Sequence, residues 1–451
     1  MISTPRLRLG AALLAGAATL AIAAPALAGS AEDGLWYYEL YNFDDFHAQG
    51  IDGAGVTIAV IDSPIYGEFP TLKGADITSK QVACTVEAAS PHAELPPAQS
   101  DDPRIASHGT NVTAIIAGTG TGFPDQIGVP GIAPAAAVLT YAASTTDLSQ
   151  GDAIGPNCTQ PDGDVGGTMP DAIVQAVDDG AQIISISGGE AGSPALVNAL
   201  AYAYQHDVIV VVGLANQGSA EKARQLPPAN LNGVVSVAAI DSNGDVPVNF
   251  EGNDTVNVDV DVVAPGIEML TNGSFEEPWE QQELSNGASY ATPFVSAVLA
   301  LGIQKYPQAT PNQLLQSLIH NTGLETHDPE LDATGHFGYG IVDPITFLGA
   351  DPTVYPDVNP FLEDEPRNPA VDPWGPTKDD VLGTAVATPS AKPTVTAAPS
   401  SEPTPNADAD ASDTPIAAIA LVLGVVLIVG AGVTVAIVMS RRSKEASHGS
   451  E

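Results

Sequence analysis

Basic residues are scarce in this chain of 451 residues, where 14 lysines and arginines stand against 54 aspartates and glutamates. The formal net charge at pH 7 is −40, and a surface of that sign repels nucleic acid and anionic lipid. We therefore exclude nucleic acid as a partner. Because a high net charge also keeps proteins soluble, it does not by itself identify any specific partner.

Two long uncharged apolar runs stand near the ends of the chain. The first is residues 9–22; Arg6 and Arg8 precede it, and Ala26-Leu27-Ala28 ends the segment of residues 1–28. This order of charge, apolar core and small residues is typical of a secretory signal peptide. We expect cleavage after Ala28 and export of the chain that follows.

Residues 416–439 form the second segment, which has 24 residues and no charge. As a helix it would be about 36 Å long, enough to cross a hydrocarbon core of about 30 Å. Arg441, Arg442 and Lys444 follow directly, which places the tail, residues 440–451, in the cytoplasm. The sequence thus predicts a single-pass protein of the cell membrane, with the lipid bilayer as a partner and residues 29–415 outside the cell.

Cysteine occurs only twice in this exported chain, as Cys84 and Cys158. A single disulfide between them is the natural interpretation, and two free buried thiols are the alternative. Large apolar residues are few over residues 351–415, where Pro, Ala, Thr, Ser and Asp predominate. Such a segment cannot bury enough surface to fold, so we expect a disordered linker there and a folded domain over residues 29–350.

Within that domain, continuous apolar runs predict buried strands over residues 55–61, 137–141, 183–186 and 208–212. Helical patterns lie between them, including one that starts at Thr168 as its cap and another at residues 195–204. Alternating strands and helices predict an α/β fold with a parallel sheet covered on both faces. Residues 256–262 alternate strictly, which predicts a half-exposed strand near the sheet edge.

Four polar residues follow these elements at their boundaries. Asp62 ends the first buried strand, His108 stands where a loop enters an apolar helix, and Ser289 begins another helix behind a glycine. Asn216 follows the strand over residues 208–212. Strand ends and helix starts gather at one edge of a parallel sheet, so these side chains can converge. They match the needs of serine hydrolysis: a nucleophile, a base, an orienting carboxylate and an oxyanion donor.

Each of these residues taken alone is more often structural, as a helix cap or a turn residue. Their joint occurrence in the order Asp, His, Asn, Ser favours the catalytic interpretation. A metal-dependent hydrolase is disfavoured because the His-Glu-x-x-His spacing is missing around His320, His327 and His336, so we predict no metal site and no required cofactor. An acidic loop contains Asp328, Glu330 and Asp332. Calcium is one interpretation of this loop, and a solvated acidic loop is the simpler one.

Three segments carry a specific resemblance. Ala59-Val60-Ile61-Asp62, His108-Gly109-Thr110-Asn111-Val112 and Gly287-Ala288-Ser289-Tyr290-Ala291-Thr292-Pro293 are similar to the aspartate, histidine and serine blocks of the subtilases, the subtilisin-like serine endopeptidases. The resemblance extends over about residues 35–348 and implies a three-layer subtilisin-like fold that hydrolyses proteins or peptides. It implies a triad of Asp62, His108 and Ser289, with Asn216 as the oxyanion donor. A substrate would lie as an added strand between two segments, Gly166-Gly167 and Ser187-Gly188-Gly189.

Features outside the domain narrow the resemblance. The lack of room for a pro-domain before the core, the Pro-rich linker and the apolar span are similar to the mycosins, the membrane-anchored subtilases of actinobacterial type VII secretion. That likeness implies secretion-system membrane components as partners. Three departures, Pro64, Ala215 and Ala288, support an alternative: a catalytically weak or inactive subtilase that serves as a scaffold or binding subunit.

Overall fold

The computed structural model describes residues 34–87, 94–144, 158–159, 165–190, 192–214, 227–248, 259–332, 334–364, 376–378 and 381. The chain divides into two compact units, residues 1–391 and 392–451, and the second lies wholly outside the described residues. The predicted signal peptide, apolar span and cytoplasmic tail also lie outside them. Among the described residues no helix is long and apolar enough to cross a membrane.

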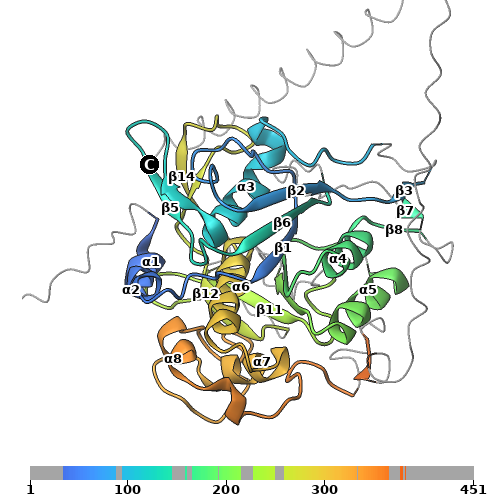
Figure 1. Cartoon of the computed structure of the whole chain (residues 1–451), viewed down its shortest axis with the longest axis vertical. Coiled ribbons are helices and arrows are strands. Elements are labelled where there is room, and N and C mark those ends of the chain that lie inside the picture. The colour runs from blue at the N-terminus through green and yellow to red at the C-terminus, as the bar shows by residue number, and fades with distance from the viewer. Residues whose placement is uncertain are drawn as a thin grey trace, which may run out of the picture. The chain divides into compact units, whose positions relative to one another are not determined.

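A seven-stranded parallel sheet forms the centre of the first unit (Figure 1). Every neighbouring pair of its strands is parallel, in the order β12-β11-β10-β9-β1-β6-β2. The predicted α/β fold with a central parallel sheet is therefore confirmed. The strands are β1 Thr57–Asp62, β2 Ile77–Gln81, β6 Ala137–Ala142, β9 Ile183–Ile186, β10 Ile209–Gly213, β11 Val235–Ile240 and β12 Val262–Pro265.

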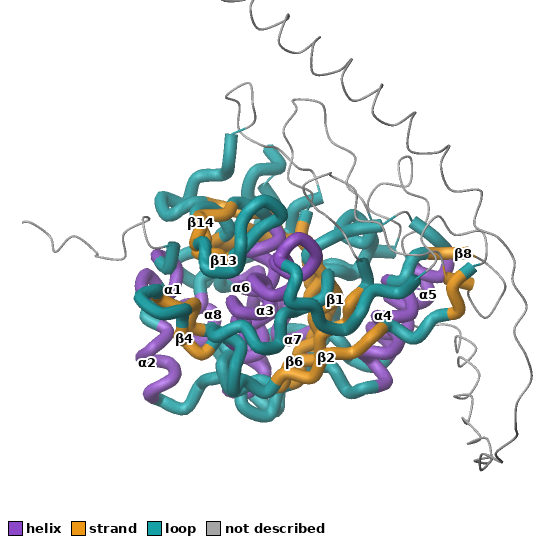
Figure 2. The backbone as a smooth tube through the Cα atoms, turned by 90° about the horizontal axis from the view of Figure 1, so that it is seen from above, coloured by secondary structure: helices purple, strands orange, loops and turns teal. Residues whose placement is uncertain are grey.

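Helices cover both faces of this sheet, as Figure 2 shows from above. On β1, Ile58 and Val60 belong to the core that contains α3 and α6, whereas Ala59 and Ile61 belong to the core of α4 and α5. This alternation follows from the two-residue period of a strand. The helices are α1 Trp36–Leu40, α2 Phe43–Ala48, α3 Pro103–Ala117, α4 Met169–Asp178, α5 Pro194–Gln205, α6 Ala288–Lys305, α7 Pro311–His320 and α8 Pro344–Gly349.

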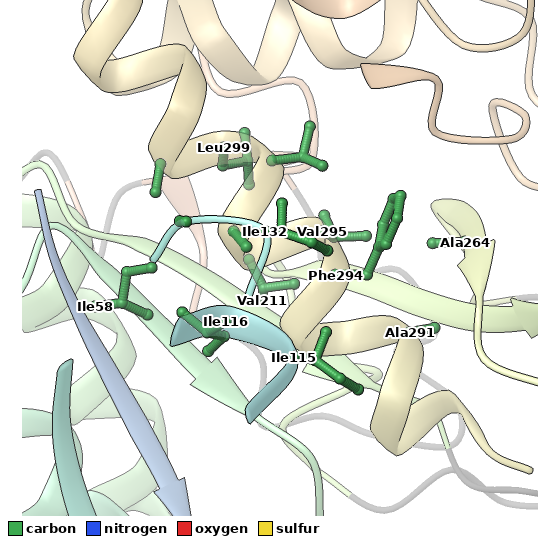
Figure 3. Packing of buried hydrophobic residues seen from close by; sticks show 14 of the residues in the cluster. Ile58, Ile115, Ile116, Ile132, Val211, Ala264, Ala291, Phe294, Val295 and Leu299 are labelled. Atoms are coloured by element: carbon green, nitrogen blue, oxygen red, sulfur yellow. The ribbon is translucent and has the colours of Figure 1, made fainter. Parts of the chain in front are cut away.

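Helix α6 is the most buried of these elements. Phe294, Val295 and Leu299 are fully buried and pack with Ile115 and Ile116 of α3 in one cluster (Figure 3). The first residue of α6 that could carry chemistry, Ser289, is thus fixed by a rigid helix that crosses the domain core. Helix α3 packs against the same helix, so the positions of His108 and Ser289 are set by one contact between two helices.

Three smaller sheets border the central one. The first joins β3 Thr85–Val86, β7 Cys158–Thr159 and β8 Val165–Gly166, and the predicted disulfide, Cys84–Cys158, is present at its start. The other two are antiparallel pairs: β4 Thr119–Thr121 with β5 Ile127–Pro130, and β13 Met269–Asn272 with β14 Gln282–Ser285.

The last sheet strand departs from its prediction. Strand β12 begins only at Val262 and all its residues are buried, although a half-exposed strand was predicted over residues 256–262. Residues 256–258 lie outside the described residues. The edge is buried because a later segment pairs with it: the Val263 N–H donates to Gly340 O at 3.0 Å, and the Val342 N–H to Val263 O at 2.9 Å.

The C-terminal boundary of the packed domain also differs from the prediction. A 3-10 helix, η2 Pro352–Val354, follows α8, and Phe361 is fully buried. The Gly233 N–H donates to Phe361 O at 2.9 Å, and the Glu363 N–H donates to Asn232 Oδ1 at 2.8 Å. The predicted boundary at residue 350 is therefore too early, because apolar anchors such as Phe361 stand within a polar, Pro-rich composition.

Candidate active site

Asp62 and His108 meet at the carboxyl end of β1. Asp62 is the last residue of that strand, and His108 Nδ1 lies 2.8 Å from its Oδ1 and 3.0 Å from its Oδ2. The side chains are 5% and 15% exposed, respectively. The Ser63 N–H also donates to Asp62 Oδ1, at 2.6 Å, so the carboxylate is held on two sides. This geometry fixes the ring and directs its other nitrogen away from Asp62.

The charge state of His108 follows from the same contact. Burial alone would lower the pKa of the imidazole, but the charge of Asp62 and its hydrogen bond outweigh that penalty. The pKa of His108 therefore stands above its ordinary value. The site stabilises an imidazolium once a proton reaches the ring, which is what a base in acyl transfer requires.

His108 lies deeper in its helix than the sequence predicted. Helix α3 begins at Pro103, with Asp102 as its N-cap accepting from the Arg104 N–H at 3.0 Å, so His108 lies in the second turn and not at the helix start. An aspartate followed by proline is a strong start signal that the prediction overlooked. The close approach of α3 to β1 depends on Gly109, where a Cβ would lie 2.4 Å from the Ser63 carbonyl oxygen.

Ser289 lies in the first turn of α6, behind Gly287 at the N-cap. Two bonds tie it to the residue after β9: the Ser187 hydroxyl donates to Ser289 O at 2.8 Å, and the Ser289 hydroxyl donates to Ser187 O at 3.3 Å. The ring of the next residue, Tyr290, lies 6.0 Å from the His108 ring, centroid to centroid. The structure thus brings the ends of β1 and β9 and the beginning of α6 to one edge of the sheet.

A cavity of about 380 Å³ opens beside His108. Helix α3 forms one wall, and the β13–β14 hairpin forms the other. Asn111 joins the two walls: its Nδ2 donates to Asn272 O and its Oδ1 accepts from the Asn272 N–H, both at 2.9 Å. Sequence analysis assigned no role to Asn111, because its partner lies 161 residues away. The remaining lining includes Arg104, Ser107, Glu276, Glu277, Glu283, Ser285 and Tyr290.

The two predicted substrate segments differ in how open they are. Gly188 is exposed, and a Cβ there would meet no atom within 4 Å, so one side of this segment is open. Gly166 lies in β8, and Gly167 follows it. Gly167 is packed instead of open, because a Cβ there would lie 2.0 Å from Oε2 of Glu190. Glu190 is the residue after Gly189, so its carboxylate links the two segments.

Glu190 was missed by sequence analysis, and its contacts are unusual. Thr168, predicted to cap α4, donates its hydroxyl to Ala143 O and makes no side-chain cap bond. Glu190 Oε2 instead accepts from the Met169 N–H at 3.4 Å, while its buried Oε1 has no hydrogen-bond partner. Burial and the nearby charge of Asp171 raise the pKa of Glu190 to about 8, against a weaker lowering by the Met169 N–H.

Two predicted residues cannot be placed. Asn216, the expected oxyanion donor, and Ala215 before it lie outside the described residues. Of the histidines considered for a metal site, His320 Nδ1 pairs with His327 O at 2.8 Å, and His327 Nε2 pairs with the Thr322 hydroxyl at 2.9 Å. In the acidic loop, hydrogen bonds from Thr334 and from the backbone lower the pKa of Asp332 to about 2, so this carboxylate is committed to its own turn.

Residues 53–340, more than half of the chain, match the sequence profile of the Subtilase family. The chain belongs to the subtilase family. Fervidolysin of Fervidobacterium pennivorans is 29% identical over 324 residues, which are 68% of this subtilase and 42% of fervidolysin. Subtilisin DY of Bacillus licheniformis is 28% identical over 313 residues, which are 67% of this subtilase and 94% of that protein. By family the chain is a subtilisin-like serine endopeptidase.

A solved structure agrees with the fold of this subtilase. The crystal structure of fervidolysin has a TM-score of 0.52 at 24% identity and covers 74% of this chain and 48% of that one. MycP1 from Mycobacterium smegmatis has a TM-score of 0.49 at 22% identity and covers 72% and 86% of the two chains. A similarity as low as the second carries no argument about function.

Proposed function

We propose that this subtilase cleaves peptide bonds outside the cell through Asp62, His108 and Ser289. The observation that supports it most is the paired bond between Asp62 and His108 Nδ1 at the sheet edge where α6 presents Ser289. When a substrate carbonyl arrives, the Ser289 hydroxyl turns from the Ser187 carbonyl toward His108 and gives its proton to the ring. The oxygen attacks the carbonyl carbon and forms a tetrahedral intermediate.

The tetrahedral intermediate then breaks down as His108 returns the proton. His108 gives its proton to the leaving amine, the C–N bond breaks, and the acyl group remains on Ser289 until water, activated by His108, releases it. The Ser289 N–H, at the start of α6, donates to the oxyanion, and we propose Asn216 as the second donor. The cavity beside His108 receives the leaving-group side of the substrate, since the leaving amine must stand next to the ring that protonates it.

The test uses the purified full-length chain and a fluorophosphonate probe that labels activated serines. We expect labelling of the wild type and none of Ser289→Ala. The matched control is Ser296→Ala, a second serine of α6 whose hydroxyl bonds only within the helix, to Thr292 O at 2.9 Å; it should be labelled as strongly as the wild type. Equal labelling of Ser289→Ala would overturn the assignment of the nucleophile.

We also propose that residues 416–439 anchor the enzyme in the cell membrane, with residues 29–415 outside and residues 440–451 in the cytoplasm. The support is the uncharged apolar run and the basic residues that follow it. Deletion of residues 416–439 should move the protein from the carbonate-resistant membrane fraction to the medium. Retention of the deleted chain in the membrane would contradict the proposal.

A place in type VII secretion is a further proposal, supported only by the linker and the apolar span of the sequence. The alternative role, a scaffold subunit with weak or no catalysis, is motivated by Pro64 after the aspartate and Ala288 before the serine. Secretion measured in cells separates the two. Loss of secretion in both the deletion strain and Ser289→Ala favours the protease, whereas loss in the deletion strain alone favours the scaffold.

A further inference from the structure

Glu190 is the one carboxylate among the described residues that has a buried oxygen without a hydrogen-bond partner. One carboxylate oxygen, Oε2, is 3.4 Å from the Met169 N–H, a long contact, and the other, Oε1, is buried without a hydrogen-bond partner in the part of the chain that the structure describes. Leaving a buried polar atom unpaired costs about 1–3 kcal/mol, and such atoms are rare in native proteins. A group kept in that state needs an explanation beyond its single weak bond to the α4 N-terminus.

The position of Glu190 supplies one. It stands three residues after Ser187, whose carbonyl oxygen is 3.3 Å from the Ser289 hydroxyl, so its backbone lies at most about 11 Å along the chain from that contact. Its carboxylate packs on Gly167 of the facing segment. Glu190 therefore lies between the two segments proposed to bind the substrate strand, and it is not part of the lining of the cavity beside His108.

The chemistry of the missing partner follows from the group. Asp171 of α4 adds a second negative charge, and among the described residues no cation makes an ion pair with Glu190. A side chain that donates hydrogen bonds and carries positive charge would satisfy Oε1 and offset the charge of Glu190. Gly188 is exposed, so the segment that carries Glu190 has one open face.

We propose that Glu190 is a specificity-determining residue that receives a lysine or arginine side chain of the substrate, on the acyl side of the scissile bond and within about four residues of it. The inference rests on the proposed peptidase function. The structural alternative is that Glu190 only caps the N-terminus of α4. Glu190→Gln separates the two, because glutamine keeps an oxygen that can accept from the Met169 N–H but removes the charge.

The experiment incubates the full-length chain with a proteome-derived peptide library at pH 8.5, above the pKa of Glu190, and identifies the cleaved bonds by mass spectrometry. We expect lysine and arginine to be enriched at one position on the acyl side in the wild type, and this enrichment to fall at least about tenfold in Glu190→Gln. Glu325→Gln, which removes an exposed charge in the loop after α7, is the matched control and should retain the enrichment. Equal enrichment in all three proteins would overturn the inference.

Paired peptides add a second readout. With one lysine and one norleucine substrate, the ratio of kcat/KM should increase from pH 6 to pH 8.5 in the wild type, because the raised pKa of Glu190 leaves it protonated at the lower pH. The ratio cancels the titration of His108, which affects both substrates equally. In Glu190→Gln the ratio should not change with pH, and a ratio that changes as in the wild type would contradict the inference.

A binding measurement keeps this inference separate from the proposed function. Fluorescence anisotropy with Ser289→Ala measures the same lysine and norleucine peptides without any cleavage. Tighter binding of the lysine peptide that is lost in the Ser289→Ala, Glu190→Gln double variant supports Glu190 even if the wild type proves inactive toward every substrate. Labelling of Ser289 by fluorophosphonate together with equal binding of both peptides would leave the protease standing and reject the role of Glu190.

Discussion

The two sides of the active centre differ in how completely their polar groups are paired. On the β1–α3 side, the Asp62 carboxylate holds His108 and the Ser63 N–H, and Asn111 makes two bonds to the backbone of Asn272. On the β9–α4 side, Gly188 faces open space and Glu190 Oε1 has no partner. The first side has the complete pairing of a preorganised site, and the second has an unpaired acceptor that, under our proposal, a substrate side chain fills.

The largest effect expected on the paired side comes from Asp62→Asn. The substitution keeps the shape of the side chain but removes the charge that orients and stabilises the His108 imidazolium, so kcat should fall about ten-thousandfold. Because the attraction that raises the pKa of His108 is lost while its burial remains, the acid limb of the pH–rate profile should move to lower pH. An acid limb that stays in place would show that another group sets it.

Asn111→Ala tests whether pairing on that side also supports the fold. The change leaves the buried N–H and carbonyl oxygen of Asn272 without their partner, which should lower the free energy of unfolding by about 3 kcal/mol in denaturant titration. The control is Asn312→Ala, whose amide bonds to the exposed Asp357 carboxylate and should cost less than about 0.5 kcal/mol. Equal losses would mean that the hairpin is held by its apolar contacts.

Two glycines probe the incomplete side. With the norleucine peptide, which needs no charge at Glu190, Gly167→Ala should displace the Glu190 side chain and lower kcat/KM about tenfold, and Glu190→Ala in the same chain should restore part of the loss by removing the clash. Gly188→Ala meets no atom within 4 Å, so the melting temperature should not change while KM rises about threefold. An unchanged KM would show that the substrate strand does not contact Gly188.

The smallest effect concerns stability and pH. Folding raises the pKa of Glu190 from 4.5 to about 8, so the folded state favours the protonated acid, and the wild type loses stability as the pH rises through this window. Glu190→Gln does not titrate and should melt a few degrees above the wild type at pH 8.5, with the difference gone at pH 4. The same difference at both pH values would show that charge is not the cause.

The parallel sheet could be predicted well because each of its buried strands is a continuous apolar run, a pattern that can be recognised from neighbouring residues alone. Strand β9 has the predicted bounds, and Asp62 ends β1 as expected. Contacts distant in the chain account for what was missed. Thr168 stands where a helix cap is expected, but its hydroxyl donates to Ala143 O instead. A glutamate such as Glu190 is expected at the surface, and only the fold shows that its Oε1 is buried.

The disulfide carries a consequence for where this enzyme can work. Cys158 lies in β7 and pairs with Val86 of β3, two residues after Cys84, on one side and with Gly166 of β8 on the other. The disulfide therefore anchors the strand that leads into Gly167. Reduction would leave the triad in place but free the wall against which Glu190 packs. We expect a chain kept under reducing conditions to have a loosened wall beside Glu190, and oxidation of the two cysteines to restore it.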